Sequence, residues 1–104
     1  MAYFIRKRFD ESCFTWQKDY EFNRMFIACV LRDCERTLQA RGYLFVNDIY
    51  EKLGFPLTKE GQVKGWTYEN EQTEFKWSIY KIKNENAIGI KLYSMKNILY
   101  VLPE

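Results

Sequence analysis

The pattern of hydrophobic and polar residues divides the chain into a helical first half and a strand-rich second half. From residue 16 to residue 41, apolar side chains recur at steps of three, four and seven, the spacing of a helix with one face against a core. The positions of this stripe are Tyr20, Phe22, Phe26, Ile27, Cys29, Val30, Leu31, Cys34 and Leu38. Possible N-caps are Asp10, Ser12 and Thr15. Gly42 is expected to end the helix.

A second, shorter helix is predicted directly after the first. Asn47 or Asp48 can cap its start, and the apolar residues that follow have helical spacing. Gly54 is expected to end it, because Pro56 prevents a helix from continuing. Residues 16–54 are therefore expected to form the helical half of the chain.

From Gly65 the period changes from helical to alternating, which indicates strands. The predicted strands cover residues 65–68, 75–82, 88–92 and 98–102. Within the second strand the parity slips, which favours either a β-bulge near Ser78–Tyr80 or a strand with two apolar faces. Short polar loops between strands imply antiparallel neighbours, so residues 65–103 are expected to form a β-meander.

The fold class predicted from these elements is α+β. A long N-terminal amphipathic helix and a short second helix pack on a three- to four-stranded antiparallel β-meander. Residues 1–15 are expected to be an arm or a short strand, and residues 1–104 a single domain, because 104 residues suit one core. Apolar residues make up 47% of the chain and aromatic residues 18%, enough to fill that core.

Cysteine content and hydropathy favour the cytoplasm. The three cysteines, Cys13, Cys29 and Cys34, have no framework spacing and are expected to be reduced thiols that behave as small hydrophobic residues. No apolar run approaches the roughly 20 residues of a membrane span. The first residues lack the apolar region of a signal peptide, so no membrane association is expected.

Little catalytic chemistry is available, because the chain contains no histidine. It also has no Cys-x-x-Cys motif and no glycine-rich phosphate loop, so no metal and no cofactor are expected. Glu69, Glu71 and Glu74 cluster around one predicted loop, where solvating charges are the favoured interpretation over an acid–base pair. The sequence therefore predicts a protein that is not an enzyme.

The candidate binding residues are basic or aromatic. Net charge is only +2, and the one tight basic run is Arg6, Lys7 and Arg8. Tyr68 and Tyr80 lie on strands with charged residues, so either core packing or stacking with bases is open to them. The residues expected to be structural are Gly42, Gly54, Gly65, Trp66 and Trp77.

Residues 47–66 follow the order short helix, turn, possible helical turn and strand, which is similar to the middle of a winged helix-turn-helix. The recognition helix would then be Thr58 to Lys64. This segment contains Gly61 and offers few side chains to a DNA groove, which weakens that hypothesis.

Two segments carry a resemblance to a known family. Gly42 to Gly54 (GYLFVNDIYEKLG) and Thr58 to Trp66 (TKEGQVKGW) resemble small uncharacterised proteins encoded by phages and integrated mobile elements of Gram-positive bacteria. Lys91-Leu92-Tyr93 departs from that family's acidic, apolar strand. The resemblance implies a genomic setting and a fold, but it transfers no functional residue.

Two functional hypotheses follow. The first is an accessory protein in the cytoplasm of a bacterial host that binds a host protein or a defence complex. An inhibitor such as an anti-CRISPR protein is one form of it, by association with the genomic setting. The alternative is a small nucleic-acid-binding or transcription-regulatory protein that uses the basic N-terminal segment and the exposed aromatic residues. The oligomeric state is left open.

Overall fold

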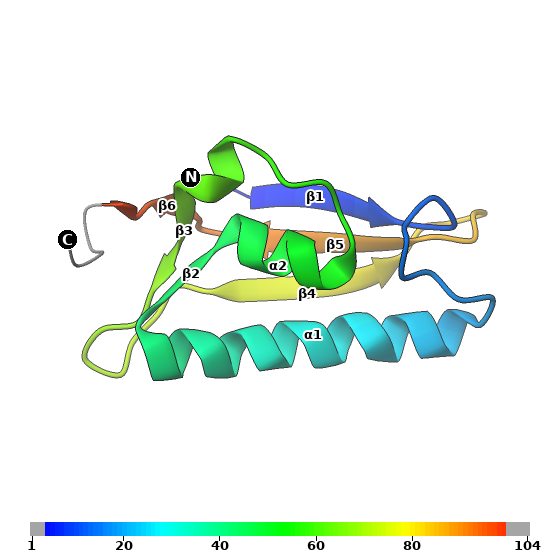
Figure 1. Ribbon diagram of the computed structural model, residues 1–104. Helices are drawn as coiled ribbons and strands as arrows, with labels where there is room; N and C mark the ends of the chain where they lie inside the picture. Colours follow the sequence, from blue (N-terminus) through cyan, green and yellow to red (C-terminus); the bar gives the residue numbers. More distant parts are fainter. Residues whose placement is uncertain (1–3, 100–104) are drawn as a thin grey trace.

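The computed structural model describes residues 4–99, and Figure 1 shows helices beside antiparallel strands. The helices are α1 (Tyr20–Arg41) and α2 (Val46–Leu53), and a short 3-10 turn, η1, covers Glu60–Gln62. The strands are β1 (Phe4–Phe9), β2 (Tyr43–Phe45), β3 (Lys64–Thr67), β4 (Lys76–Lys81), β5 (Ile88–Tyr93) and β6 (Lys96–Asn97). The predicted α+β class is confirmed.

The described strands form two antiparallel sheets of three strands each. The first has the order β1-β5-β4 and the second the order β2-β3-β6. β1 pairs along the whole of β5, from Phe4 opposite Tyr93 to Phe9 opposite Ile88. A single meander over residues 65–103 is therefore not observed. β1 precedes α1 in the sequence, and β2 lies between α1 and α2. The alternation of residues within one strand does not indicate which distant strand pairs with it.

Helix α1 starts four residues later than the sequence predicted. Asp19 caps it, because its carboxylate accepts a hydrogen bond from the backbone N–H of Phe22 at 3.1 Å. The fully buried Asn23 holds the preceding loop, since its side-chain amide bonds both the N–H and the carbonyl of Gln17. The expected caps Asp10, Ser12 and Thr15 all lie in that loop.

Both predicted glycine stops are confirmed. Gly42 has φ 90° and donates its N–H to the carbonyl of Leu38, and Gly54 has φ 84° after α2. At the start of α2, the carboxylate of Asp48 accepts the N–H of Phe45 at 2.9 Å. Asp48 therefore satisfies a free backbone donor of the first turn, as the sequence indicated, although Phe45 occupies the N-cap position.

Strand β4 is regular, so the bulge considered near Ser78–Tyr80 is wrong and the two-sided strand is correct. Its register with β5 runs without a break from Lys76 opposite Tyr93 to Lys81 opposite Ile88. The strand predicted at residues 98–102 is also wrong for residues 98 and 99, the part of it that the structure describes. β6 occupies Lys96–Asn97, while residues 100–102 lie outside the described part of the chain.

The core lies between the helices and one face of the β1-β5-β4 sheet. Trp66 is 1% exposed and donates its indole N–H to the carbonyl of Tyr93 at 2.7 Å. A Cβ added at Gly65 would lie 1.9 Å from the carbonyl oxygen of Leu44, so β3 requires glycine there. Trp77 is half-buried, and its indole N–H donates to Glu35. Trp66 therefore belongs to the core, whereas Trp77 lies at its edge.

The proposed recognition helix is absent from the described residues. Within Thr58 to Lys64, only Glu60–Gln62 are helical, as a single 3-10 turn. A Cβ at Gly61 would lie 2.1 Å from the side-chain oxygen of Asn47, so this turn is held closely against α2. A turn of this length has no face to place in a major groove, and the winged-helix interpretation is therefore wrong.

Candidate nucleic-acid interface

The β1-β5-β4 sheet has one covered face and one open face. Ile88, Ile90 and Leu92 of β5 are buried against residues of α1 and α2, and Figure 1 shows α2 in front of this sheet. Because side chains alternate along a strand, the residues between them point to the opposite side. We call this opposite side the open face.

Register places three outward positions from each strand in rows across the open face. These rows are Phe4, Tyr93 and Lys76; Arg6, Lys91 and Ser78; and Arg8, Gly89 and Tyr80. The first row is mostly aromatic and the second mostly cationic. No position of the open face carries an acidic side chain, although the chain has 14 acidic residues.

Two aromatic rings are exposed on the open face. Phe4 is 40% exposed and Tyr80 is 38% exposed. The ring of Tyr80 lies over Gly89, since a Cβ built there would fall 2.1 Å from its Cζ. Phe4 contacts the ring of Tyr93, with 5.8 Å between the centroids. Both rings are thus supported from below and leave a surface to solvent.

Cations lie beside these rings. The Nζ of Lys91 is 5.4 Å from the ring centroids of both Phe4 and Tyr80, and the guanidinium of Arg6 is 5.4 Å from Phe4. Within residues 4–99, neither Lys91, Arg6 nor Lys76 makes an ion pair. Their charges are therefore available to an anionic ligand.

Arg8 differs from the other cations because carboxylates already neutralise it. Its guanidinium bonds Asp10 at 2.6 Å and Glu85 at 2.9 Å, and these bonds raise the arginine pKa. Hydrogen bonds from Ser12 and Arg8 lower the pKa of Asp10 to about 2. The bond from Arg8 also lowers the pKa of Glu85. This cluster closes one end of the open face and leaves the free cations at its middle and other end.

The open face brings together some of the predicted binding residues and not others. Arg6, Arg8 and Tyr80 share it. Lys7 points to the covered side, where its Nζ lies 4.9 Å from the ring centroid of Tyr50. Tyr68 follows β3 in the other sheet and is half-buried against the core.

Three residues of the open face were not predicted as binding residues from the sequence: Phe4, Lys91 and Tyr93. The signal was present in Lys91-Leu92-Tyr93, which alternates a cation and an aromatic residue around a buried leucine. In the sequence alone, this segment stands out only as a departure from the related family.

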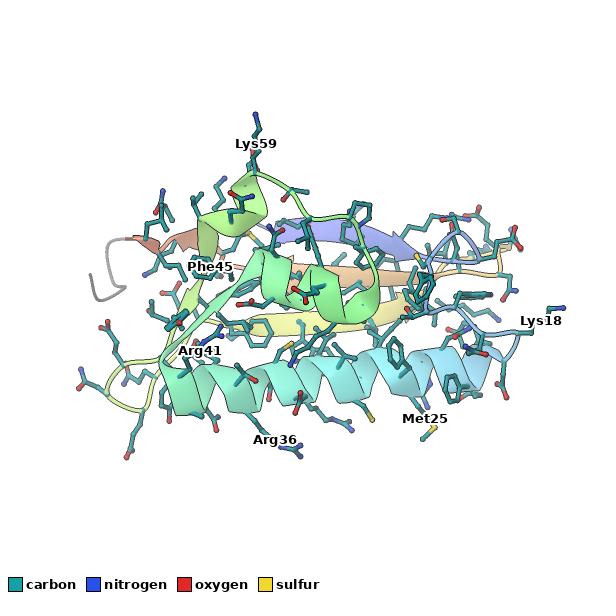
Figure 2. All side chains as sticks on the ribbon, viewed as in Figure 1. Lys18, Met25, Arg36, Arg41, Phe45 and Lys59 are labelled. Atoms are coloured by element: carbon teal, nitrogen blue, oxygen red, sulfur yellow. The ribbon has the colours of Figure 1, made fainter. Side chains whose placement is uncertain are left out.

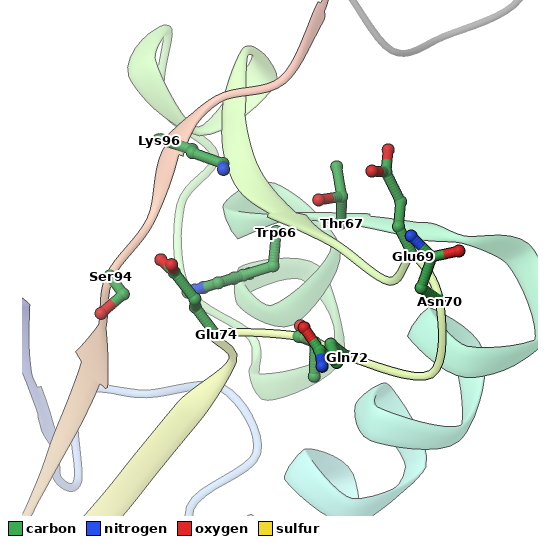
Figure 3. Close-up of a pocket in the computed structure, with 9 residues that line it drawn as sticks. Trp66, Thr67, Glu69, Asn70, Gln72, Glu74, Ser94 and Lys96 are labelled. Carbon is green, nitrogen blue, oxygen red and sulfur yellow. The ribbon is translucent and has the colours of Figure 1, made fainter.

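The three glutamates considered as an acid–base pair lie near a different feature, a polar hollow of about 280 Å³ beside Trp66 (Figure 3). Glu69 and Glu74 line it, and Figure 3 shows their carboxylates on different sides of the hollow. All three glutamates, Glu71 included, are exposed. The hollow therefore holds solvated charges rather than an enclosed carboxylate pair.

The described part of the chain contains neither a candidate metal site nor a candidate membrane-spanning helix. Among residues 4–99, no cluster of three or more His, Cys, Asp or Glu side chains is placed to hold a metal ion. No helix in that range has the length and apolar character needed to cross a membrane. The three cysteines are free, and burial raises the pKa of Cys34 to about 11.

Comparison with known proteins gives a family without a known activity. No curated protein matches the chain, and no solved structure matches it either. One family model matches residues 5–102, which covers both sheets and both helices. The chain accordingly belongs to the family of unknown function DUF6353.

Proposed function

We propose that the protein binds single-stranded nucleic acid on its open face. The observation that carries this proposal is the arrangement of Phe4, Tyr80 and Lys91, two exposed rings with an unpaired cation between them. Aromatic rings stack on unpaired bases of any sequence, and cations beside them contact the phosphates. This proposal is the alternative hypothesis from the sequence, a nucleic-acid-binding protein. The proposed binding surface is the open face of the sheet and not a winged helix.

The shape of the site favours single strands over a duplex. Stacking on Phe4 and Tyr80 requires bases whose faces are free, and the bases of a duplex are already stacked. Duplex readout uses a helix or a two-stranded ribbon that enters a groove. The open face is a sheet surface, and α1 and α2 lie on its other side.

The stacking contact is tested by replacing one ring. Tyr80→Ala should weaken binding of a fluorescently labelled oligo(dT) or oligo(rU) of about 12 nucleotides by ~1–3 kcal/mol, as measured by anisotropy. Phe14→Ala is the matched control, because Phe14 is an aromatic residue that is 93% exposed and lies outside the open face. Equal reductions in affinity for the two variants would contradict stacking at Tyr80.

The phosphate contact is tested through salt. Lys91→Gln should lower affinity and reduce the slope of log K against log salt by about 0.7 for each phosphate that the side chain no longer neutralises. Lys59→Gln is the control, since Lys59 is also exposed and points away from the rest of the molecule in Figure 2. If Lys59→Gln weakened binding and Lys91→Gln left it unchanged, the nucleic acid would bind near η1 and not on the open face.

The hypothesis of a host protein or defence complex as partner stays a prediction, as do the phage or mobile-element setting and the bacterial cytoplasm. Pulldown with the tagged protein from a Gram-positive lysate tests the partner. Recovery of one host protein in nuclease-treated lysate supports it. Recovery of a host protein only when nucleic acid is intact supports nucleic-acid binding on the open face instead.

A further inference from the structure

The N-terminal half of α1 carries apolar side chains on its solvent face as well as on its core face. Phe22 is 51% exposed, Met25 is 59% exposed and Cys29 is exposed. Their spacing of three and four residues places them in one line, which we call the outer stripe. Figure 2 shows Met25 pointing away from the rest of the molecule. The expectation that Phe22 and Cys29 belong to the core is therefore wrong.

Two opposite charges flank the outer stripe on the same side. Glu21 lies beside Phe22 at one end, and Arg32 follows Cys29 by three residues at the other. They are separated by 11 positions, about three turns of helix, so they project within roughly 20° of each other. Within residues 4–99, Arg32 makes no ion pair, and Glu21 contacts Arg24 at 3.1 Å while staying 67% exposed. If a second copy of this helix lies against the first in the opposite direction, the acid of each copy faces the base of the other. The surface is therefore complementary to itself.

We propose that a second copy of this chain packs antiparallel on the outer stripe, about a two-fold axis near the middle of the line. In this arrangement Met25 faces Cys29 of the second copy. Arg32 meets Glu21 of the second copy, and symmetry forms that ion pair twice. The line is only about two turns long, so the dimer is weak and reversible.

The dimer does not depend on nucleic-acid binding. The outer stripe and the open face belong to separate elements, α1 and the sheet strands, and share no residue. Failure of one proposal therefore leaves the other standing, and the two are measured by different experiments.

Charge exchange tests the proposed pairing. Sedimentation equilibrium should show reversible dimers of the wild-type chain, and Glu21→Arg or Arg32→Glu alone should each raise the dissociation constant about tenfold. The double variant E21R/R32E should recover most of the affinity, because it restores both ion pairs with their signs exchanged. A wild-type chain that stays monomeric up to its solubility limit would overturn the proposal. A folded double variant that dimerises no better than the single variants would do the same.

Disulfide trapping tests the register. A disulfide requires Cα atoms about 4.4–6.8 Å apart, which the proposed pairing provides between position 25 and Cys29 of the second copy. Met25→Cys should form a covalent dimer under mild oxidation, and M25C/C29S should form at least about tenfold less at the same protein concentration. Equal trapping in the two variants would contradict the antiparallel register. A heterologous partner on the stripe would give no covalent dimer in either.

Discussion

Single residues at the junction of the two sheets hold the fold together. Trp66 fills the space between β3 and the end of β5, makes an edge contact with Phe75 at 4.7 Å and bonds a β5 carbonyl. Its replacement by alanine would leave a large cavity and would remove this hydrogen bond. We expect Trp66→Ala to lower the free energy of unfolding by about 3–5 kcal/mol in urea titration. A decrease below about 1 kcal/mol would contradict the burial described.

The turn from Glu69 to Gln72 offers a stabilising change. These two residues exchange backbone hydrogen bonds at 2.9 and 3.0 Å, and Asn70 and Glu71 between them have φ of 52° and 62°. Such a type I′ turn favours glycine at its second central position. Glu71→Gly should raise the free energy of unfolding by about 0.5–1 kcal/mol, because it relieves a left-handed glutamate.

Glu69→Gly is the matched control for that change. Residue 69 does not have positive φ, so glycine there adds only freedom to the unfolded chain and should destabilise the protein. Stabilisation by both substitutions, or by neither, would show that turn geometry is not the cause. Thermal melts of the three proteins in one buffer decide between these outcomes.

Asp10 connects stability to acid pH. Its folded pKa of about 2 lies below the ordinary value of 3.8, because Ser12 and Arg8 donate hydrogen bonds to the carboxylate. The carboxylate therefore stabilises the fold above pH 3.8, and this contribution disappears as pH falls towards 2. We expect Asp10→Asn to be less stable than wild type at pH 6, with the difference shrinking over that acid range. A difference that is constant with pH would contradict the assignment.

At the scale of elements, the caps decide where α1 begins. Four polar residues before the helix were able to cap it, and the structure uses Asp19, because buried Asn23 holds the chain before it in a non-helical loop. Asp19→Ala should cost about 1 kcal/mol of stability, while Asp19→Ser should keep most of it. Thr15 lies outside this cap and instead donates its hydroxyl to the carbonyl of Leu53 at 2.7 Å, so circular dichroism of Thr15→Ala should show no loss of α1 helix content.

Elements could be predicted from the sequence where the signal is local. Several elements lie close to their predicted places: both glycine stops, α2, and the strands around Trp66, Trp77 and Ile90. Periodicity and turn residues are properties of neighbours along the chain, so the sequence shows them directly. The pairing of β1 with β5 joins residues that are 79 to 89 positions apart, from Phe9 opposite Ile88 to Phe4 opposite Tyr93. No local pattern records such a partner, so the meander was the simplest inference and the two-sheet arrangement was not predicted.

At the scale of the whole molecule, the candidate site exists only because of that distant pairing. Arg6 and Tyr80 were predicted as binding residues, yet Lys91, which lies between their strands, was not. Its neighbours along the chain, Ile90 and Leu92, are core residues, and its exposure depends on which side of β5 the helices cover. Topology, more than composition, therefore places three cations that make no ion pair within residues 4–99, Arg6, Lys76 and Lys91, on one face of a chain with net charge +2.

Whether the open face binds single-stranded nucleic acid is decided by the salt dependence of binding. Fluorescence anisotropy of a labelled single strand is followed across a salt series for wild type and for the triple variant Arg6→Gln, Lys76→Gln and Lys91→Gln. We predict wild-type binding that weakens steeply with salt, and a folded triple variant whose slope is about 2 smaller. A wild-type protein that does not bind at low salt, or a triple variant that binds with the same slope, would contradict the claim.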